Sequence, residues 1–457
     1  ASAIEINDTP LAGVVRRYSP NLTMALSVEY PTAGAAYTSS SLGVKYHAGM
    51  LLFGSEDLKR YYIGYFDNKK CYKHKYMDNV TSLRADDVVS SYNTEGYFYP
   101  TSYAKEEVIG GQRYVGLCSD PEEFSGNLMN WLTMSAIDVF RKTTTGGNRA
   151  LGVQKNSIPY SKGDTATETY LRRTMVYESP NGITDLNDNT GELQNAFRSL
   201  FLRFRGVKLN RNLMSRVLPH VYVDQFTQDQ GSVWRSVRNL NNPVSQRGSD
   251  TIYFMNSGFT TQAIKYPSGD WWGMHFYHRM ATRWRQAEVN KYFKRLPVVV
   301  KVCDPSVGLE DNCKVYPNGT AKPEGLLQVN SDKGMRVSVF GYPNNSVNSG
   351  DTNEKYMNGG SLRARMKDLS RTTTEGGIVS GREWDEQTGQ LIVNPDTTDA
   401  SRSGVTNSGV INYLNKFGDS GQYRSYDPAA ELYYAALSYV MGAGVVYPLN
   451  NPSELNK

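Results

Sequence analysis

Alternating hydrophobic positions predict strands at widely separated places in the chain. In residues 20–27, Leu22, Met24 and Leu26 alternate with other residues, which is the period of a β-strand. Residues 296–302 form a short apolar run of strand length. β-Branched alternation in residues 335–341 indicates a third strand.

Helical periodicity is clearest in residues 125–141, where apolar residues recur every three or four positions before a Thr- and Gly-rich stretch. Ser125 is a suitable N-cap, and we expect Trp131 on this amphipathic helix to anchor core packing. A last helix is predicted over 427–442, where an Asp-Pro pair opens the pattern and a glycine ends it. A weaker pattern predicts a helix over 167–174.

Two long segments interrupt this alternation of strands and helices. Residues 31–124 are rich in Gly, Ser, Tyr and Lys and lack sustained helical periodicity, so they predict short strands and long loops. Residues 151–295 carry weaker helical patterns between polar loops. Strands that alternate with helices favour an α/β core, and both segments are expected as insertions in it.

Composition favours a soluble globular protein. The chain has 457 residues, enough for two or three ordinary domains or for one large domain with insertions. Hydrophobic residues make up 39% and charged residues 21%, which argues against disorder. The 32 tyrosines are an excess that suits contact surfaces and glycan sites, although single tyrosines are also common in half-buried strands.

The charge pattern argues against dedicated nucleic-acid binding. The net charge of +5 arises from 50 basic and 45 acidic side chains that are spread along the chain, without a basic run to line a phosphate backbone. No apolar run approaches the roughly 20 residues that span a bilayer. The opening Ala1-Ser2-Ala3 fits either a cytosolic protein or a mature secreted one. Cysteine usage separates these two locations.

The four cysteines fall as two separated pairs, Cys71 with Cys118 and Cys303 with Cys313. Neither pair has CxxC spacing or a nearby histidine, so disulfides are favoured over a zinc site. In the chain-entropy model the 71–118 bridge would stabilise by roughly 4 kcal/mol and the 303–313 bridge by roughly 3 kcal/mol. Four cysteines allow three pairings, and free thiols are the alternative; disulfides indicate an oxidising compartment.

One polar stretch has part of a calcium-binding pattern. Asp185, Asn187 and Asn189 resemble the opening of an EF-hand loop, but Gly191 falls one place late and Ala196 stands where the bidentate glutamate belongs. A polar turn is therefore the preferred interpretation.

Patterns for catalysis are also incomplete. His275 and His278 lie near Asp270 and could supply a general base, yet no Gly-x-Ser-x-Gly elbow accompanies them. Walker, dinucleotide-binding and His-Glu-x-x-His patterns are absent from the sequence. We therefore expect no catalytic residue, no cofactor and no enzymatic activity.

Seven short motifs of different sequence follow one another along the chain. They occupy residues 64–72 (GYFDNKKCY), 124–134 (FSGNLMNWLTM), 138–149 (DVFRKTTTGGNR), 322–328 (KPEGLLQ), 360–366 (GSLRARM), 408–413 (SGVINY) and 427–434 (DPAAELYY). Together they resemble the N-terminal region of PilY-type (PilC-type) tip adhesins and assembly factors of type IV pili. The resemblance covers residues from about 60 to 445.

The resemblance implies a von Willebrand factor A-like fold. This is an α/β, Rossmann-type core sheet with helices on both faces and large loop- or β-rich insertions, followed in that family by a calcium-binding β-propeller that is not expected in this chain. The implied core consists of residues 20–30, 125–150, 296–302 and 335–445, with 31–124 as a Tyr-rich, disulfide-clasped insertion and 151–295 as a second insertion.

A-type domains raise the question of a metal site. Many bind a divalent cation through Asp-x-Ser-x-Ser after the first strand, where a carboxylate and two hydroxyls supply hard oxygen ligands. The pattern falls here on Ser27, Glu29 and Pro31. Because proline has no side-chain oxygen, the site is degenerate and no bound metal is predicted.

For function, the resemblance implies a non-enzymatic protein at the extracellular pilus tip, reached after periplasmic export. It would adhere to host cells or surfaces through an unidentified receptor and would assist pilus assembly or capping through minor pilins. The alternatives are a purely structural assembly cap, and a secreted carbohydrate-binding protein or carbohydrate-active enzyme. Because loops diversify while a core must stay packed, we expect Tyr97, Tyr99 and Tyr103 to form the binding surface.

Overall fold

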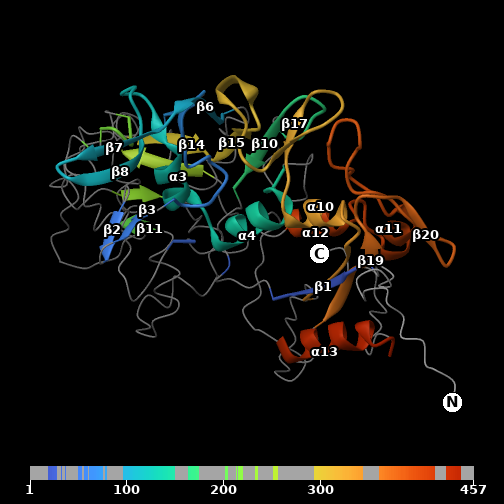
Figure 1. Ribbon diagram of the computed structural model, residues 1–457. Coiled ribbons are helices and arrows are strands. Elements are labelled where there is room, and N and C mark those ends of the chain that lie inside the picture. The colour runs from blue at the N-terminus through green and yellow to red at the C-terminus, as the bar shows by residue number, and fades with distance from the viewer. Residues whose placement is uncertain are drawn as a thin grey trace, which may run out of the picture.

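Figure 1 shows the computed structural model of the protein. It describes residues 19–27, 32, 36–37, 50–53, 56–59, 61–75, 78–79, 96–149, 163–173, 201–203, 213, 215–219, 232–234, 251–255, 293–342, 360–416 and 429–443. Over these residues the fold is mixed α/β, with one three-stranded sheet, two five-stranded sheets and several two-stranded ribbons.

Segments far apart in the sequence meet in the three-stranded sheet, whose strand order is β1-β18-β19. β1 (Asn21–Leu26) runs parallel to β18 (Arg336–Gly341), and β19 (Ser361–Asp368) runs antiparallel to β18. The hydroxyls of Thr23 and Ser338 lie 2.9 Å apart across the β1–β18 pair, although 315 residues separate them in sequence. The strands predicted over 20–27 and 335–341 are therefore neighbours.

Helices cover both faces of this sheet (Figure 1). On one face, Phe340 packs in a cluster with residues of α13 (Ala429–Val440). On the other face, Val337 and Val339 pack with residues of α10 (Leu326–Ser331) and α12 (Val410–Lys416). The alternation of side chains along β18 sends neighbouring residues to opposite clusters. We call this sheet with its helices the β18 region.

One five-stranded sheet surrounds Cys71 and has the order β10-β15-β6-β4-β9. Its strands are β10 (Thr169–Arg172), β15 (Val299–Val302), β6 (Phe98–Tyr103), β4 (Lys70–His74) and β9 (Phe124–Ser125). β15 and β6 are parallel, whereas the other neighbours are antiparallel. Helix α3 (Gly126–Thr133) follows β9 directly and is buried along its whole length. We call this sheet, with α3 and both disulfides, the disulfide region.

The strand at 299–302 does not lie in the sheet where the expected A-type core would place it. It does not join β1, and instead lies between β10 and β6, with Val302 opposite Thr169 and Val300 opposite Phe98. Val299 and Val300 are both fully buried, because a central strand is covered on both faces. The segments expected as insertions therefore supply the partners of a strand expected in the core, and the described residues do not show a von Willebrand factor A-like sheet.

The single helix predicted over 125–141 is in fact two helices. α3 ends at Thr133, and α4 (Ala136–Thr145) begins after the extended residues Met134 and Ser135. The carboxylate of Asp138 accepts a hydrogen bond from the Ser135 N–H at 3.3 Å, which is one half of a capping box. This local start signal interrupts an apolar periodicity that continues through both helices.

Other local predictions have mixed outcomes. Ser125 is the N-cap of α3, as predicted, and its hydroxyl accepts from the Leu128 N–H at 3.4 Å. Trp131 is buried in the main core cluster, also as predicted. The helix predicted over 167–174 is wrong, because this segment contains strand β10, which pairs with β15 in the buried sheet. Tertiary pairing has overridden the weak helical pattern here.

The remaining elements form smaller units. They are β2 (Met50–Phe53) with β3 (Glu56–Lys59), β7 (Lys105–Ile109) with β8 (Gln112–Leu117), β16 (Cys313–Val315) with β17 (Ala321–Pro323), β20 (Thr373–Glu375) with β21 (Ile378–Ser380), the sheet of β11 (Phe201–Arg203), β12 (Ser232–Trp234), β13 (Thr251–Met255), β14 (Phe293–Pro297) and β5 (Asp78–Asn79), helix α11 (Thr397–Ser403) and the 3₁₀-helix η4 (Pro305–Val307). Among the described helices, none is long and apolar enough to cross a membrane.

Candidate functional site

Several of the motifs that carry the family resemblance contact one another in the structure. Two buried asparagines of α3 hold the loop that contains the first motif. Asn130 accepts from the Phe66 N–H at 3.0 Å and donates to the Tyr62 and Phe66 carbonyls at 2.8 Å. Asn127 accepts from the Tyr62 N–H at 2.8 Å. The amides of the second motif thus satisfy backbone groups of Phe66 in the first motif and of Tyr62 just before it.

Glycine is required where these two motifs touch. A Cβ atom on Gly64 would lie 2.2 Å from Asn130 Oδ1, and one on Gly126 would lie 2.1 Å from the Asp67 carbonyl oxygen. Neither distance leaves room for a side chain unless the loop and helix separate. The glycines of both motifs are therefore explained by close packing.

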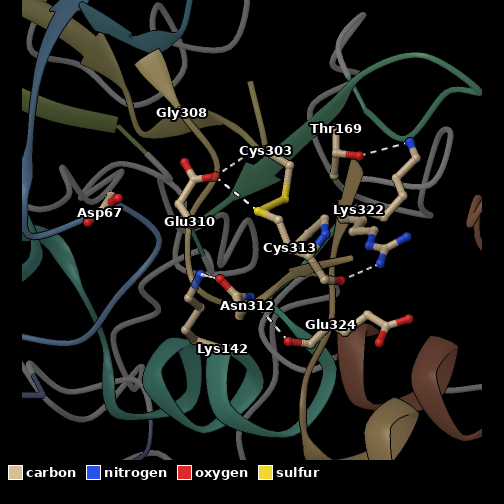
Figure 2. The surroundings of a disulfide bond; sticks show 12 residues. Asp67, Lys142, Thr169, Cys303, Gly308, Glu310, Asn312, Cys313, Lys322 and Glu324 are labelled. Atoms are coloured by element: carbon tan, nitrogen blue, oxygen red, sulfur yellow. Dashed lines mark hydrogen bonds between the residues drawn. A yellow bond between two sulfur atoms is a disulfide. The ribbon is translucent and has the colours of Figure 1, made fainter. Parts of the chain in front are cut away.

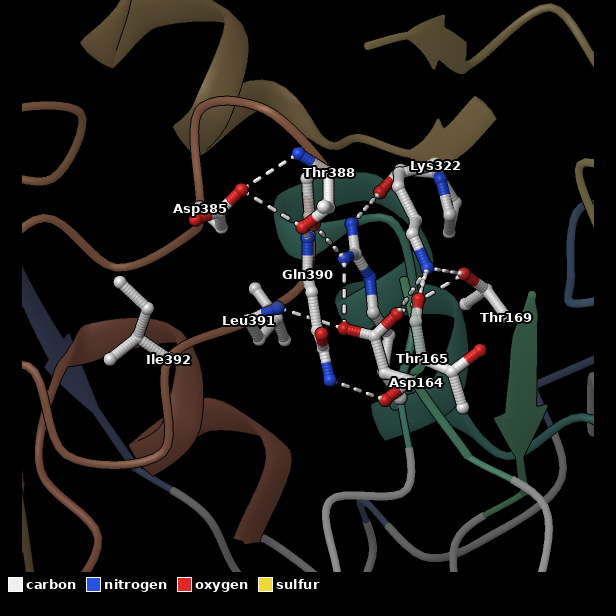
Figure 3. A network of polar contacts seen from close by, with 12 residues as sticks. Asp164, Thr165, Thr169, Lys322, Asp385, Thr388, Gln390, Leu391 and Ile392 are labelled. Carbon is white, nitrogen blue, oxygen red and sulfur yellow. Dashed lines mark hydrogen bonds and ion pairs between the residues drawn. The ribbon is translucent and has the colours of Figure 1, made fainter. Parts of the chain in front are cut away.

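A second contact between motifs is a buried cluster of charges, the Asp164 cluster, which consists of Arg149, Asp164 and Lys322. Figure 3 shows Asp164 and Lys322 in this cluster. Lys322 Nζ donates to Asp164 Oδ1 at 2.8 Å and to Thr169 Oγ1 at 2.9 Å. Arg149 Nη1 lies 3.4 Å from Asp164 Oδ2, which also accepts from the Leu391 N–H at 2.8 Å. Burial lowers the pKa of Lys322, and the attraction of Asp164 opposes this effect.

The Asp164 cluster joins the two regions. Asp164 precedes β10 of the disulfide region, whereas Leu391 belongs to the buried apolar cluster of the β18 region. Arg149 also donates to the carbonyls of Pro323 and Gly389, so that its guanidinium bridges segments distant in sequence. The chemistry of this cluster is ion pairing between buried side chains, each at most 2% exposed.

The structure contains the disulfide Cys71–Cys118, which links β4 to the end of β8. Both cysteines are buried. Beside the bond, Arg216 Nε donates to the Cys118 carbonyl at 2.8 Å, and its two terminal nitrogens bind the Glu107 carboxylate at 2.6 and 3.1 Å. The hydrogen bond from Arg216 lowers the pKa of Glu107. The disulfide and this ion pair together fix the base of the β7–β8 hairpin.

The second disulfide, Cys303–Cys313, closes a loop of ten residues around Glu310 (Figure 2). Glu310 Oε2 accepts from the Cys303 N–H at 2.8 Å and lies 3.0 Å from Cys313 Sγ. Its other oxygen lies 3.3 Å from Nζ of Lys70, a fully buried lysine that also donates to the Gly308 carbonyl at 2.6 Å. The loop is thereby tied to β4, next to Cys71.

Helix α4 contacts the same loop through Lys142. Its Nζ donates to Asn312 Oδ1 at 2.9 Å (Figure 2). Burial lowers the pKa of Lys142, and the carboxylates of Glu310 and Asp67 oppose this shift. Lys70, Lys142 and Glu310 were not singled out from the sequence. The sequence signals for them are the motifs 64–72 and 138–149, which contain Lys70 and Lys142, and the position of Glu310 inside a closely spaced cysteine pair.

Potential metal ligands gather at both disulfides. Cys71, Cys118 and Glu123 form one such group, and Cys303, Glu310 and Cys313 form the other, in the part of the chain that the structure describes. Because all four sulfurs are used in disulfides, neither group offers a thiolate. These groups are therefore better described as carboxylates packed beside disulfides.

Other candidate residues from the sequence have different outcomes. Ser27, the first position of the degenerate metal pattern, is exposed just after β1, whereas Glu29 and Pro31 lie outside the described residues. The EF-hand-like stretch around Asp185 and the histidines His275 and His278 also lie outside them.

The three candidate contact tyrosines occupy different environments. Tyr97 is only 7% exposed and packs against Tyr170, with ring centroids 5.0 Å apart, so it is a core residue rather than a contact residue. Tyr99 is half-buried, and Tyr103 is 60% exposed at the end of β6. Residues two positions apart on a strand share a face, so alternation does not separate Tyr97 from Tyr99; Tyr97 precedes β6 and packs in a small cluster with Tyr170 and Val299.

An exposed hairpin continues the chain after Tyr103. The β7–β8 hairpin turns at Gly110 and Gly111, whose φ angles of 61° and 80° suit a two-residue type I′ turn. Val108 and Ile109, beside the turn, are exposed although they are apolar. Tyr103 and this hairpin tip are thus the solvent-facing apolar positions next to the first disulfide.

Two comparisons with known proteins found similar sequences. Residues 56–196 match the family model described as "PilY1 homolog, small alpha/beta domain". The chain is 31% identical over 459 aligned residues to the "Type IV pilus biogenesis factor PilY1 homolog" of Xylella fastidiosa, which covers 97% of this chain and 30% of that protein. The chain therefore spans about a third of the length of this curated relative. No solved structure matched.

The matched domain coincides with much of the disulfide region. Residues 56–196 contain β4, β6, β9 and β10, which are four of the five strands of its sheet. They also cross the boundaries expected at 124/125 and 150/151, so that one domain model joins segments expected in a core and in two insertions. The chain is thus similar to PilY1 homologues over almost its whole length, and its residues 56–196 match their small alpha/beta domain.

Proposed function

We propose that this chain acts in type IV pilus biogenesis outside the cytoplasm, as a non-enzymatic module. The observation that carries the proposal is the similarity to a type IV pilus biogenesis factor over 97% of the chain. Two disulfides support an oxidising location, because such bonds persist mainly in exported proteins. The motifs that prompted the family resemblance serve as buried contacts, which agrees with a scaffold role.

The finer proposal is that the protein lies at the pilus tip, contacts minor pilins and adheres to surfaces. In this proposal Tyr103 and the β7–β8 hairpin tip touch the receptor or surface. An exposed aromatic ring with a hydroxyl, and exposed apolar side chains at the tip of a hairpin with a fixed base, give contact area at little cost in conformational entropy.

Complementation of a deletion strain with the full-length gene tests this function. We expect Tyr103→Ala combined with Val108→Ser and Ile109→Ser to leave pilus number unchanged and to reduce attachment several-fold, because all three side chains are exposed. Tyr97→Ala is the matched control; it removes a buried ring, so it should lower the melting temperature of the protein.

Three outcomes separate the possibilities. Loss of pili with the deletion and normal attachment by the surface variant would leave a role in assembly without this adhesive surface. Normal pili and normal attachment in the deletion strain would overturn the proposal. Turnover of a glycan by the purified chain would replace a binding role by an enzymatic one.

A further inference from the structure

A buried lysine in the β18 region lies between two carboxylates. Lys367 on β19 has its Nζ 2.6 Å from Asp396 Oδ2 and 3.0 Å from Glu383 Oε1. The exposed fractions of the side chains are 1% for Lys367, 1% for Glu383 and 7% for Asp396. Leu369, Trp384 and Val410, which adjoin these residues or bind them, belong to the buried apolar cluster. The three charges are thus held together in a dry site.

The two carboxylates are stabilised very differently. Glu383 accepts from the N–H groups of Val410 and Ile411 at 2.6 and 2.7 Å, at the N-terminus of α12, where a negative charge is favoured. Asp396 stands at the N-cap of α11, yet its side chain makes no capping hydrogen bond. Its Oδ1 is buried without any hydrogen-bond partner among the described residues. Asp396 is therefore the carboxylate that depends on Lys367 alone.

The Asp164 cluster provides a contrast within the same molecule. There Lys322 faces one carboxylate, and both oxygens of Asp164 accept hydrogen bonds from other groups as well. At Lys367, two carboxylates surround one ammonium, and one carboxylate oxygen is unsatisfied. Buried charges without full hydrogen bonding are costly, so the Lys367 site gains most from losing charge.

We propose that Lys367 and Asp396 form an intramolecular amide bond, with Glu383 as the group that relays a proton. In the ion pair, Nζ gives one proton to the Asp396 carboxylate, which produces an amine and a carboxylic acid. The amine then attacks Cγ of Asp396. Glu383 takes a second proton from the nitrogen and returns it to the departing hydroxyl, which leaves as water.

The reaction balances without any further reagent. One N–C bond forms, one C–O bond breaks, one water molecule leaves, and Glu383 ends as the carboxylate that it was at the start. The ammonium and the Asp396 carboxylate both lose their charge. The remaining negative charge is on Glu383, at the N-terminus of α12, where it is favoured. Burial lowers the pKa of Lys367 and the two carboxylates raise it more, so the ammonium is the resting form and a proton must pass to Asp396 before the nitrogen can attack.

The bond would close a covalent loop in the region that lacks disulfides among the described residues. It would link β19 to the start of α11, across 29 residues that include the β20–β21 ribbon. The proposal is independent of the role in pilus biogenesis, because it concerns only the chemistry of three side chains.

Mass spectrometry of the whole chain, purified from the periplasm with its disulfides intact, tests the bond. We expect an intact mass lower by one water than the sequence with two disulfides, and a proteolytic peptide pair joined through Lys367 and Asp396. Lys367→Arg keeps the positive charge but should restore the full mass, as should Asp396→Ala. Glu383→Gln should leave a large unreacted fraction.

The matched control is Lys69→Arg, at an exposed lysine that lies 3.2 Å from Asp311; it should keep the water loss. Full mass in the wild-type chain, measured on the monomeric folded fraction, would overturn the proposal and leave an ion pair. A water loss that persists in Lys367→Arg would also overturn it, because the modification would then lie elsewhere.

Discussion

The disulfide region and the β18 region are built from similar elements but are constrained in different ways. The disulfide region carries Cys71–Cys118 and Cys303–Cys313, and its sheet contains strands of only two to six residues. The β18 region holds longer strands between helices on both faces and has no disulfide among its described residues. Short strands bury little apolar surface each, so covalent links matter more where an exposed hairpin must be held firmly.

The two regions share a joint made of charges. At the Asp164 cluster, one carboxylate binds a lysine, an arginine and the backbone of a loop from the other region. This contact is sensitive to each of its members, because removal of one leaves a buried charge without its partner. The contrast between covalent and ionic constraints can be tested by removing each in turn.

The largest effect is expected at the joint. Asp164→Ala would leave Lys322 and Arg149 buried without their carboxylate, which should cost about 3 to 5 kcal/mol in the free energy of unfolding. Urea denaturation of the purified chain measures the loss. Asp311→Ala, at an exposed ion pair with Lys69, is the control and should change stability only slightly. Equal small effects of both variants would show that the two regions do not depend on this joint.

Removal of each disulfide should have the next largest effect. The Cys71–Cys118 bond spans 47 residues and its loss as a double alanine variant should cost about 4 kcal/mol, against about 3 kcal/mol for the ten-residue Cys303–Cys313 loop. Hydrogen exchange should increase first in peptides from β4 and β6, whereas those from β18 remain protected. Equal loss of protection in β18 would contradict the separation of the two regions.

Alkaline pH should lower the free energy of unfolding of the disulfide region, by less for each ionising tyrosine than the loss of a disulfide does. Burial raises the pKa of Tyr65 and Tyr72 well above the ordinary value of 10.0, with nearby carboxylates adding to the effect. The folded state then keeps protons that the unfolded state releases, so this stability is complete below pH 10.0 and declines as the pH rises above it. Each tyrosine should contribute a decline of about 1.4 kcal/mol per pH unit.

Urea midpoints measured at increasing pH, together with tyrosinate absorbance, check this slope. Tyr72→Phe removes one ionisable group and should make the decline shallower, even if its stability near neutral pH is lower because the Asp67 N–H loses its acceptor. An unchanged slope in this variant would mean that Tyr72 ionises within the folded state.

Several features follow from the sequence because they depend on neighbours in the chain. The alternation in 20–27 and 335–341 predicts strands β1 and β18, and Ser125 predicts the start of α3. The pairing of the cysteines favoured by their order is the pairing in the structure. The family motifs also predicted a similarity that the comparisons found, since they are short and continuous.

The sequence by itself thus determined several local elements and the class of relatives, and it favoured the cysteine pairs that the structure contains. Only the tertiary structure decided that 299–302 lies between β10 and β6, that Tyr97 is buried while Tyr103 is exposed, and that Lys367 faces two carboxylates. Hydrophobic periodicity predicts which residues are buried, but it does not predict which strand or charged side chain they contact. Contacts such as Lys322 with Asp164, 158 residues apart, exist only once the folded chain has excluded water around them.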